Sequence, residues 1–151
     1  MNQPRETVYA ALLAALEARL SPSPFITVSR RLKPWTELAA EEQPALFQVQ
    51  KGEDMQYIGR GLPPKYRLTV DLEVYAYNTA SNEDPSAPAS SVLNPLLDAI
   101  ETAFAPDPVT GVQTLGIANV SHCWIEGNIE IFEGDLNAQI MAVVPVSILT
   151  T

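Results

Sequence analysis

The sequence predicts an α+β fold in which two α-helices pack on one face of a largely antiparallel β-sheet. Three features of the 151-residue chain support this prediction: a long central run that alternates apolar and polar residues, two segments with helical spacing, and two alternating segments near the C-terminus. The expected order of elements is helix, strand, strand, strand, helix, strand, strand (α-β-β-β-α-β-β).

The first element is predicted to be a helix from about Arg5 to Leu20. Its apolar residues recur every three or four positions, as on one face of a helix: Val8, Leu12, Leu13, Leu16 and Leu20. The SPSP run that follows ends the helix, because proline cannot continue the backbone hydrogen bonding. A strand is expected at residues 24–32 (PFITVSRRL), and then a loop or short helical turn from Pro34 to Glu42.

A second strand is predicted from Ala45 to Gln50, and a third from Lys65 to Asn78. The third, KYRLTVDLEVYAYN, has one apolar face, made by Tyr66, Leu68, Val70, Leu72, Val74 and Ala76. Its other face carries Arg67, Thr69, Asp71, Glu73, Tyr75 and Tyr77. At about 3.3 Å per residue this strand would extend roughly 45 Å, so it should overhang its domain or bend around it. The stretch from Lys51 to Lys65 is rich in glycine and proline and is expected to be irregular.

The polar, proline-bearing segment from Thr79 to Ser91 fits either a domain linker or a surface loop. We favour a loop, because each flank offers one helix and two or three strands, which is too little for two separate cores. The chain is therefore expected to form a single domain, residues 1–151.

A second amphipathic helix should follow this segment, with Asn94 as its cap and Pro95 as its first helical residue. Its apolar face is made by Leu93, Leu96, Leu97, Ile100 and Phe104. The run APDPVTG then ends the helix.

The last two strands are predicted to form a hairpin around a two-residue turn at Gly134 and Asp135. The resulting register makes three apolar pairs: Ile131 with Ala138, Ile129 with Ile140, and Ile125 with Val144. Both apolar sets then fall on one face of the sheet. The opposite face carries Trp124, Glu126, Asn128 and Glu130. Pro145 in the last strand indicates a sheet edge or a bulge.

The charge balance argues against a strong grip on nucleic acid. The chain has 9 Lys and Arg against 18 Asp and Glu, a formal net charge of −9, and phosphate affinity needs clustered cations. The lone Cys123 can form no disulfide within the chain and is compatible with a reducing compartment. The apolar run YAALLAAL is too short to span a bilayer and no basic, apolar leader is visible, so we expect a protein made in the cytoplasm with no membrane partner.

The residues that usually carry catalysis are scarce. His122 is the only histidine, and its neighbour Cys123 should point to the opposite face of a strand, so the two make a poor base and nucleophile pair. We expect a half-exposed histidine beside a buried cysteine. One histidine and one cysteine cannot supply the four ligands of a usual zinc site. The run GRGLPP lacks the Lys and Ser or Thr of a phosphate-binding loop.

Five segments together resemble a known family: ETVYAALLAALEARL, PFITVSRRL, RGLPPKYRLTVDLEVYAYN, VLNPLLDAIETAF and GNIEIFEGDLNAQIMAVVPVSIL. Their order and character are similar to those of the tail terminator family of long-tailed bacteriophages, which includes lambda-like minor tail protein U. The resemblance covers nearly the whole chain and includes no catalytic-type motif. It implies a virion protein at the head-proximal end of the tail, a hexameric ring that caps the tail tube, stops its polymerisation and meets the head-side connector.

In such a ring the functional residues would line the lumen or the interfaces. Lumen carboxylates would repel the phosphates of passing DNA, which would slide through without specific binding; the candidates are Asp71, Glu73, Glu126 and Glu130. The candidate interface residues are Met55, Tyr57, Ile58, Arg60, Leu62, Tyr75, Tyr77 and Trp124. For the three aromatic residues on strand faces, ordinary packing is an equal alternative.

Two other functions fit the sequence. A head-completion or connector-adaptor protein of the neck would share the acidic, single-domain, ring-forming character. A small α+β hydrolase, with Glu126 or Glu130 as its base, would need a concave pocket lined by carboxylates. We prefer the terminator, then the neck protein, then the enzyme, and so expect neither catalysis nor a cofactor.

Overall fold

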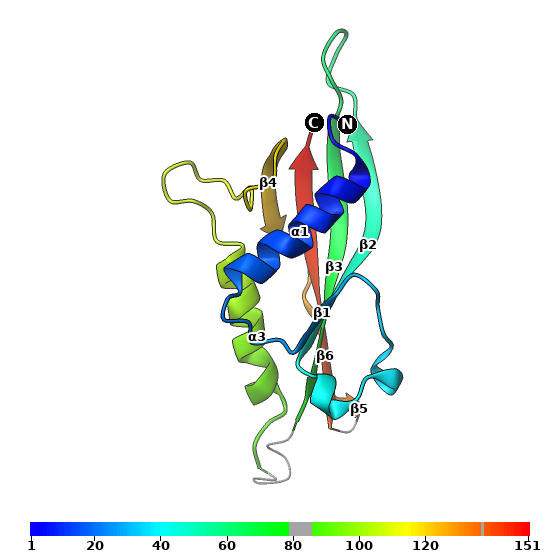
Figure 1. The fold of residues 1–151 in the computed structure, drawn as a ribbon, viewed down its shortest axis with the longest axis vertical. Coiled ribbons are helices and arrows are strands. Elements are labelled where there is room, and N and C mark those ends of the chain that lie inside the picture. Colours follow the sequence, from blue (N-terminus) through cyan, green and yellow to red (C-terminus); the bar gives the residue numbers. More distant parts are fainter. Residues whose placement is uncertain (79–85, 137) are drawn as a thin grey trace.

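The computed structural model describes residues 1–78, 86–136 and 138–151, and it confirms the predicted α+β class. Two α-helices and two short 3-10 turns accompany a mixed, mostly antiparallel sheet of six strands within these ranges (Figure 1). The elements are α1 (Arg5–Arg19), β1 (Thr27–Ser29), η1 (Trp35–Glu37), η2 (Ala40–Glu42), β2 (Ala45–Gln56), β3 (Lys65–Tyr77), α3 (Ser90–Ala103), β4 (Val120–Ile125), β5 (Glu130–Leu136) and β6 (Gln139–Thr150).

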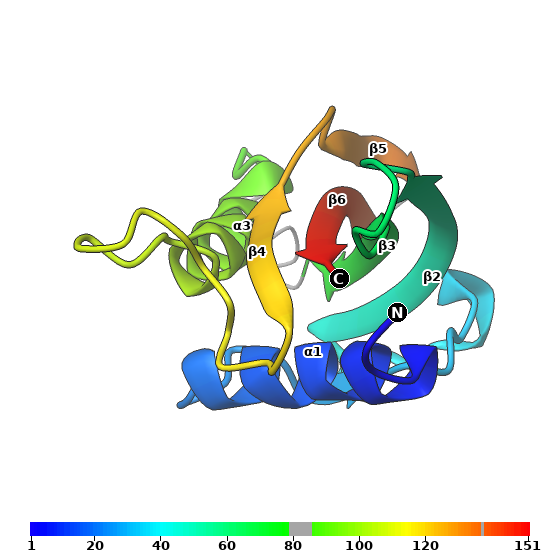
Figure 2. The same ribbon diagram turned by 90° about the horizontal axis from the view of Figure 1, so that it is seen from above.

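The sheet is built around the antiparallel pair β3 and β6. These two strands pair without a break from Tyr66 opposite Thr150 to Tyr77 opposite Gln139. Strand β2 flanks β3, and the short β1 runs parallel to the first three residues of β2 only. On the other side of β6, β4 pairs with its last residues and β5 with its first. The strands curve strongly, as Figure 2 shows.

One face of the sheet carries the main core. Both helices lie on it, α1 crossing the strands obliquely and α3 beside β4 (Figures 1 and 2). The alternate residues predicted to be apolar on β3 are buried there, together with the matching residues of β6: Leu68, Val70, Leu72, Val74, Ala76, Ile140, Ala142, Val144, Val146 and Ile148. Full burial of the Leu, Val and Ile side chains among them stabilises the fold by about 1.5 to 3 kcal/mol each.

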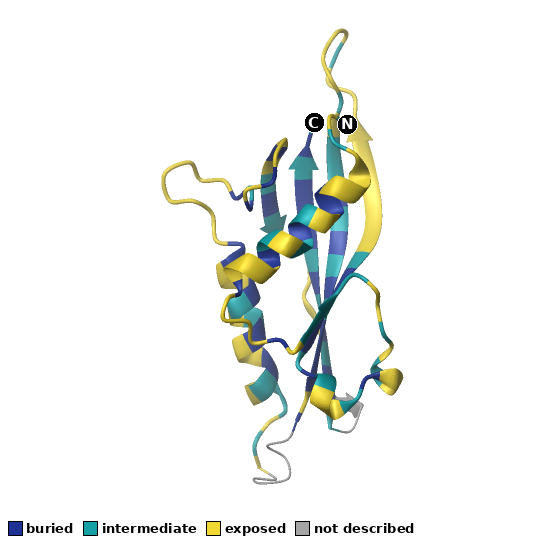
Figure 3. Cartoon of the chain, viewed as in Figure 1, coloured by how far each residue is buried: buried dark blue, intermediate teal, exposed yellow. Residues whose placement is uncertain are grey.

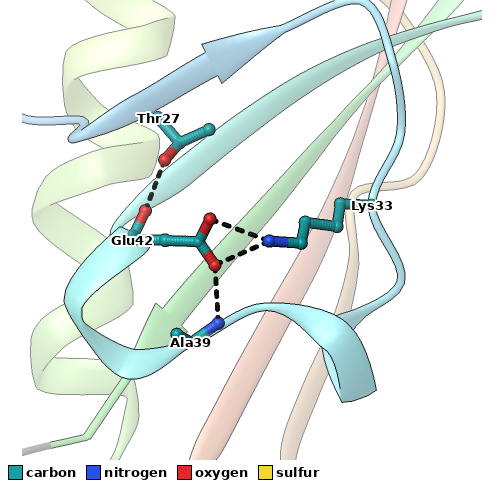
Figure 4. Close-up of polar contacts among 4 residues, drawn as sticks. All are labelled: Thr27, Lys33, Ala39 and Glu42. Carbon is teal, nitrogen blue, oxygen red and sulfur yellow. Dashed lines mark hydrogen bonds and ion pairs between the residues drawn. The ribbon is translucent and has the colours of Figure 1, made fainter.

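The opposite face, called here the outer face, is partly covered by residues 34–42. Leu38, Ala45, Phe47 and Tyr75 form a second, small core, and the Phe47 and Tyr75 rings meet edge to face with centroids 5.8 Å apart. Glu42 holds the covering segment in place (Figure 4). Its carboxylate accepts hydrogen bonds from Lys33 Nζ at 2.8 Å and from the Ala39 amide at 2.8 Å, and its carbonyl accepts the Thr27 hydroxyl at 2.8 Å.

Strand β2 is longer than predicted. The stretch from Lys51 to Lys65 was expected to be irregular, but the strand continues to Gln56, which pairs with Lys65 of β3. A bulge between Gln50 and Gly52 adds one residue, Lys51, and reverses the faces beyond it. The prediction was wrong because these residues are exposed and polar: backbone pairing with β3 holds them, without an apolar face to reveal a strand.

Helix α3 begins at Ser90, before the predicted cap at Asn94, so Pro95 lies inside the helix rather than at its first position. The earlier start is supported by a contact from another element: the Ser90 amide donates to Glu133 Oε1 of β5 at 2.8 Å. A free helix N-terminal amide is thereby satisfied across the fold. The expected polar loop from Thr79 falls partly on residues 79–85, which lie outside the described residues.

For the C-terminal hairpin, the prediction of which β6 residues face the core is confirmed, but the predicted register is wrong. Ile131 pairs with Ala142 rather than Ala138, and Leu136 pairs with Gln139, so the turn is not at Gly134 and Asp135. Gly127 explains part of the difference. Its φ of +114° is one that other residues rarely adopt, and it divides the predicted single strand into β4 and β5. Ile129 and Ile131 are exposed rather than buried with the core.

Leu72 and Ile131 provide a matched test of this architecture. Leu72 is fully buried on β3, whereas Ile131 is 48% exposed on β5. We expect Leu72→Ala to lower the free energy of unfolding by about 2 to 5 kcal/mol, because it leaves a cavity in the core. Ile131→Ala should change it by about 0.5 kcal/mol or less. Urea unfolding followed by circular dichroism measures both, and equal losses would contradict the burial described here.

Candidate functional site

The uncovered part of the outer face contains a polar hollow of about 440 Å³. It is lined by Lys51, Asp71, Glu73, Gly127, Asn128, Glu130, Val143 and Pro145. The strand register brings these residues together: Glu73 and Glu130 lie opposite Val143 from its two sides, and Asp71 lies opposite Pro145. Three of the four carboxylates predicted to line a lumen therefore share one surface.

Lys51 is the cation of this hollow. Its ammonium lies 3.1 Å from Asp71 Oδ2, and the bulge places it there as the extra residue of β2. The hydrogen bond to Asp71 and then the charge of Asp71 raise the pKa of Lys51, with smaller contributions from Glu73 and Glu130. One cation thus faces three carboxylates, and the hollow stays acidic.

Tyr75 is not part of the exposed surface. Its ring is buried in the second core, and its hydroxyl donates to Glu73 Oε2 at 3.0 Å. Burial, followed by the hydrogen bond and charge of Glu73, raises the pKa of Tyr75. Tyr75 therefore packs inside the protein, which was the alternative to its predicted role at an interface. Tyr77, at the end of β3, is 37% exposed.

Glu126 lies in a separate cluster on the same face. Its carboxylate forms an ion pair with Arg67 and accepts a hydrogen bond from Trp124 Nε1 at 2.8 Å. The Arg67 guanidinium lies 5.5 Å from the centroid of the Trp124 ring, and His122 stacks on that ring at 4.9 Å. Glu126 therefore presents a neutralised pair rather than a bare charge.

His122 and Cys123 take the positions expected from the sequence. Cys123 is fully buried, and burial raises the pKa of its thiol to about 12. His122 is half-buried on the other side of β4, where its Nδ1 accepts a hydrogen bond from the Gln113 amide at 2.9 Å. A thiol with a raised pKa that points away from the histidine does not form a nucleophile and base pair.

The connection between β2 and β3 projects beyond the sheet (Figure 1). We call residues 55–65 the hairpin tip. It exposes four large apolar side chains: Met55 (66%), Tyr57 (71%), Leu62 (57%) and Ile58 (45%). Most of the hairpin tip is exposed (Figure 3). Arg60 lies in the same segment, exposed and without an ion pair in the described part of the chain. All five predicted interface residues of this segment are thus brought together.

The base of the hairpin is fixed to α1. Arg5 Nε donates to Glu53 Oε2 at 2.6 Å, and the Tyr9 hydroxyl donates to Glu53 Oε1 at 3.1 Å. Burial, with a smaller contribution from the Glu53 charge, raises the pKa of Tyr9 to about 12. Glu53 reaches the helix because the bulge at Lys51 turned its side chain to the core face. The tip is therefore held at its base and unsupported beyond it.

Sequence reasoning missed two residues of these clusters, Lys51 and Arg67. Arg67 alternates in step with Asp71 and Glu73, so the sequence pattern placed it on the same face. Its ion pair with Glu126 could not be predicted, because it depends on β3 and β4 both pairing with β6. Lys51 gave no signal, because its stretch was expected to be irregular.

The described residues contain no group of three or more His, Cys, Asp and Glu side chains placed to hold a metal ion. None of their helices is long and apolar enough to cross a bilayer. Comparison with protein-family models and with curated proteins gave no match to this chain.

Removing the charge of Asp71 or of Glu130 should change the pKa of Lys51 by different amounts. Asp71→Asn should lower the pKa of the Lys51 ammonium most, because it removes both a charge and the strongest hydrogen-bond acceptor. Glu130→Gln should lower it less, because that carboxylate acts only through its charge. NMR titration of the lysine side chains measures both shifts.

The raised pKa of Lys51 determines how the Lys51–Asp71 pair changes stability with pH. The pair stabilises the fold below the ordinary lysine pKa, and its contribution is lost as the pH rises through the raised value. A pKa of Lys51 that is the same in Asp71→Asn and in the unchanged protein would rule out the pairing.

Proposed function

We propose that this chain is a structural virion protein that assembles as a homomeric ring, caps the end of a phage tail tube and joins it to the head-side connector. The observation that carries the proposal is the hairpin tip. It presents four apolar side chains and a cation on an anchored projection, in a chain whose net charge is −9. Apolar and aromatic side chains gathered on one projection, with Arg among them, are typical of protein interfaces.

The acidic hollow supports a role for the outer face beside DNA. Asp71, Glu73 and Glu130 lie together there with Lys51 as the cation among them. A surface with this balance repels phosphates and gives DNA nothing to bind. In the proposed ring this face lines the passage, and DNA moves along it without being held.

Three carboxylates of the outer face have partners that suit a lining better than acid and base catalysis. Asp71 is paired with Lys51, Glu73 accepts the Tyr75 hydroxyl, and Glu126 is paired with Arg67. A general base needs a free carboxylate aimed at a substrate proton. These contacts favour the structural role over a hydrolase that uses Glu126.

Native mass spectrometry of the purified protein, with negative-stain images of the same sample over a range of concentrations, tests the ring. We expect closed six-membered rings with a central hole. A protein that stays monomeric at every concentration is then mixed with isolated tail tubes, because a tube end can template the ring. Failure to assemble alone together with failure to bind tube ends would contradict the proposed function.

Charge reversal tests the lining. Glu73→Lys combined with Glu130→Lys should create measurable DNA binding that weakens steeply with added salt, because the hollow then holds three lysines. Fluorescence anisotropy with a labelled duplex measures this binding. Glu17→Lys with Glu37→Lys makes the same change in net charge at exposed sites elsewhere and serves as the control. Equal binding by the two double variants would show that the hollow has no special role.

A further inference from the structure

We propose that the hairpin tip of one copy docks into the groove between α3 and β4 of the next copy, so that the ring is joined head to tail. This inference rests on the proposed ring and adds its contact. It commits to a second copy of this chain as the occupant of the groove.

The groove is lined by apolar and acidic residues. Its volume is about 660 Å³, and its apolar lining residues are Phe104, Ala105, Pro106, Trp124 and Ile125. Asp98 and Glu101 of α3 also line it, and neither forms an ion pair with any described residue. The groove therefore offers apolar surface and two unpaired negative charges.

The hairpin tip has the complementary chemistry. From Tyr57 to Lys65 it contains two cations, Arg60 and Lys65, and no acidic residue. Its exposed Tyr57, Ile58 and Leu62 side chains supply apolar surface that can pack against the apolar residues of the groove. Opposite charges that surround an apolar contact favour one partner and one orientation.

Other hollows in the described part of the chain do not match as well. The groove along α1 beside Leu115 is lined mainly by small and apolar residues and contains no charged side chain. The hollows beside Lys33 and beside Arg19 contain cations, which would repel Arg60, and the hollow of the outer face contains Lys51. The groove beside α3 differs from them in having carboxylates and no cation among its lining residues.

The positions of the two surfaces require a contact between copies. The hairpin tip projects from one end of the sheet, whereas α3 lies away from it (Figure 1), and the groove is lined by residues of α3, by residues 104–106 that follow it and by β4. A contact between two different patches is heterologous, and such contacts close into rings when the rotation allows. The candidate interface residue Trp124 then faces the hairpin residues of a neighbouring copy.

Charge exchange between Arg60 and Glu101 tests the contact. Arg60→Glu and Glu101→Arg should each weaken ring assembly by at least about tenfold in the protein concentration required, because each places like charges together. An equal mixture of the two variants should recover rings, since both alternating contacts are then complementary. Native mass spectrometry should show equal numbers of each variant in the recovered rings. Rings that form unchanged from either variant alone would overturn the docking and leave the proposed ring intact.

Cross-linking gives a readout that does not depend on closed rings. Leu62→Cys in one copy and Thr102→Cys in another should form a disulfide dimer on mild oxidation, while the native Cys123 is fully buried and does not compete. Leu62→Cys mixed with Val109→Cys is the control, because Val109 is 90% exposed on another loop. A yield no higher than the control, with or without tail tubes, overturns the docking. Failure of the unchanged protein both to form rings alone and to bind tube ends would instead reject the proposed function.

Discussion

The unbroken pairing of β3 with β6 is the constraint on which the rest of the structure depends. Twelve consecutive cross-strand pairs fix which residues of both strands face α1 and α3 and which face outward. A shift of β3 by one residue against β6 would move Leu72 to the outer face and Asp71 and Glu73 to the core face, while Val144 kept its place. The helices, the second core and the acidic hollow all take their positions from this single register.

Periodicity made the central elements predictable. The alternation of β3 and the helical spacing of α1 depend on burial, and burial leaves an apolar pattern in the sequence. The faces of β6 were predictable for the same reason. The start of α3 was not, because it depends on Glu133, a residue some forty positions away that reaches the Ser90 amide.

The individual residues of the candidate site could be named from the sequence, but their grouping into clusters could not. Asp71, Glu73 and Glu130 were named from their faces, yet their grouping depends on how β5 pairs with β6, which the sequence pattern misplaced. The separation of Glu126 from them follows from Gly127, whose backbone conformation divides β4 from β5. Lys51 joins its cluster because of the bulge in β2, and Arg67 joins its cluster because β6 lies between β3 and β4. Neither feature can be recognised from the neighbouring residues in the sequence.

Strand β1 covers only the first three residues of β2, so among the described strands nothing pairs with the far edge of β2 from about Gln48 to Gln56. An open strand edge of this length is a template on which other chains can aggregate. Here the edge reads KGEDMQ over Lys51–Gln56, with three charged side chains and a glycine. The polarity that hid this strand from sequence patterns is also what protects a concentrated solution of the protein from indiscriminate strand addition.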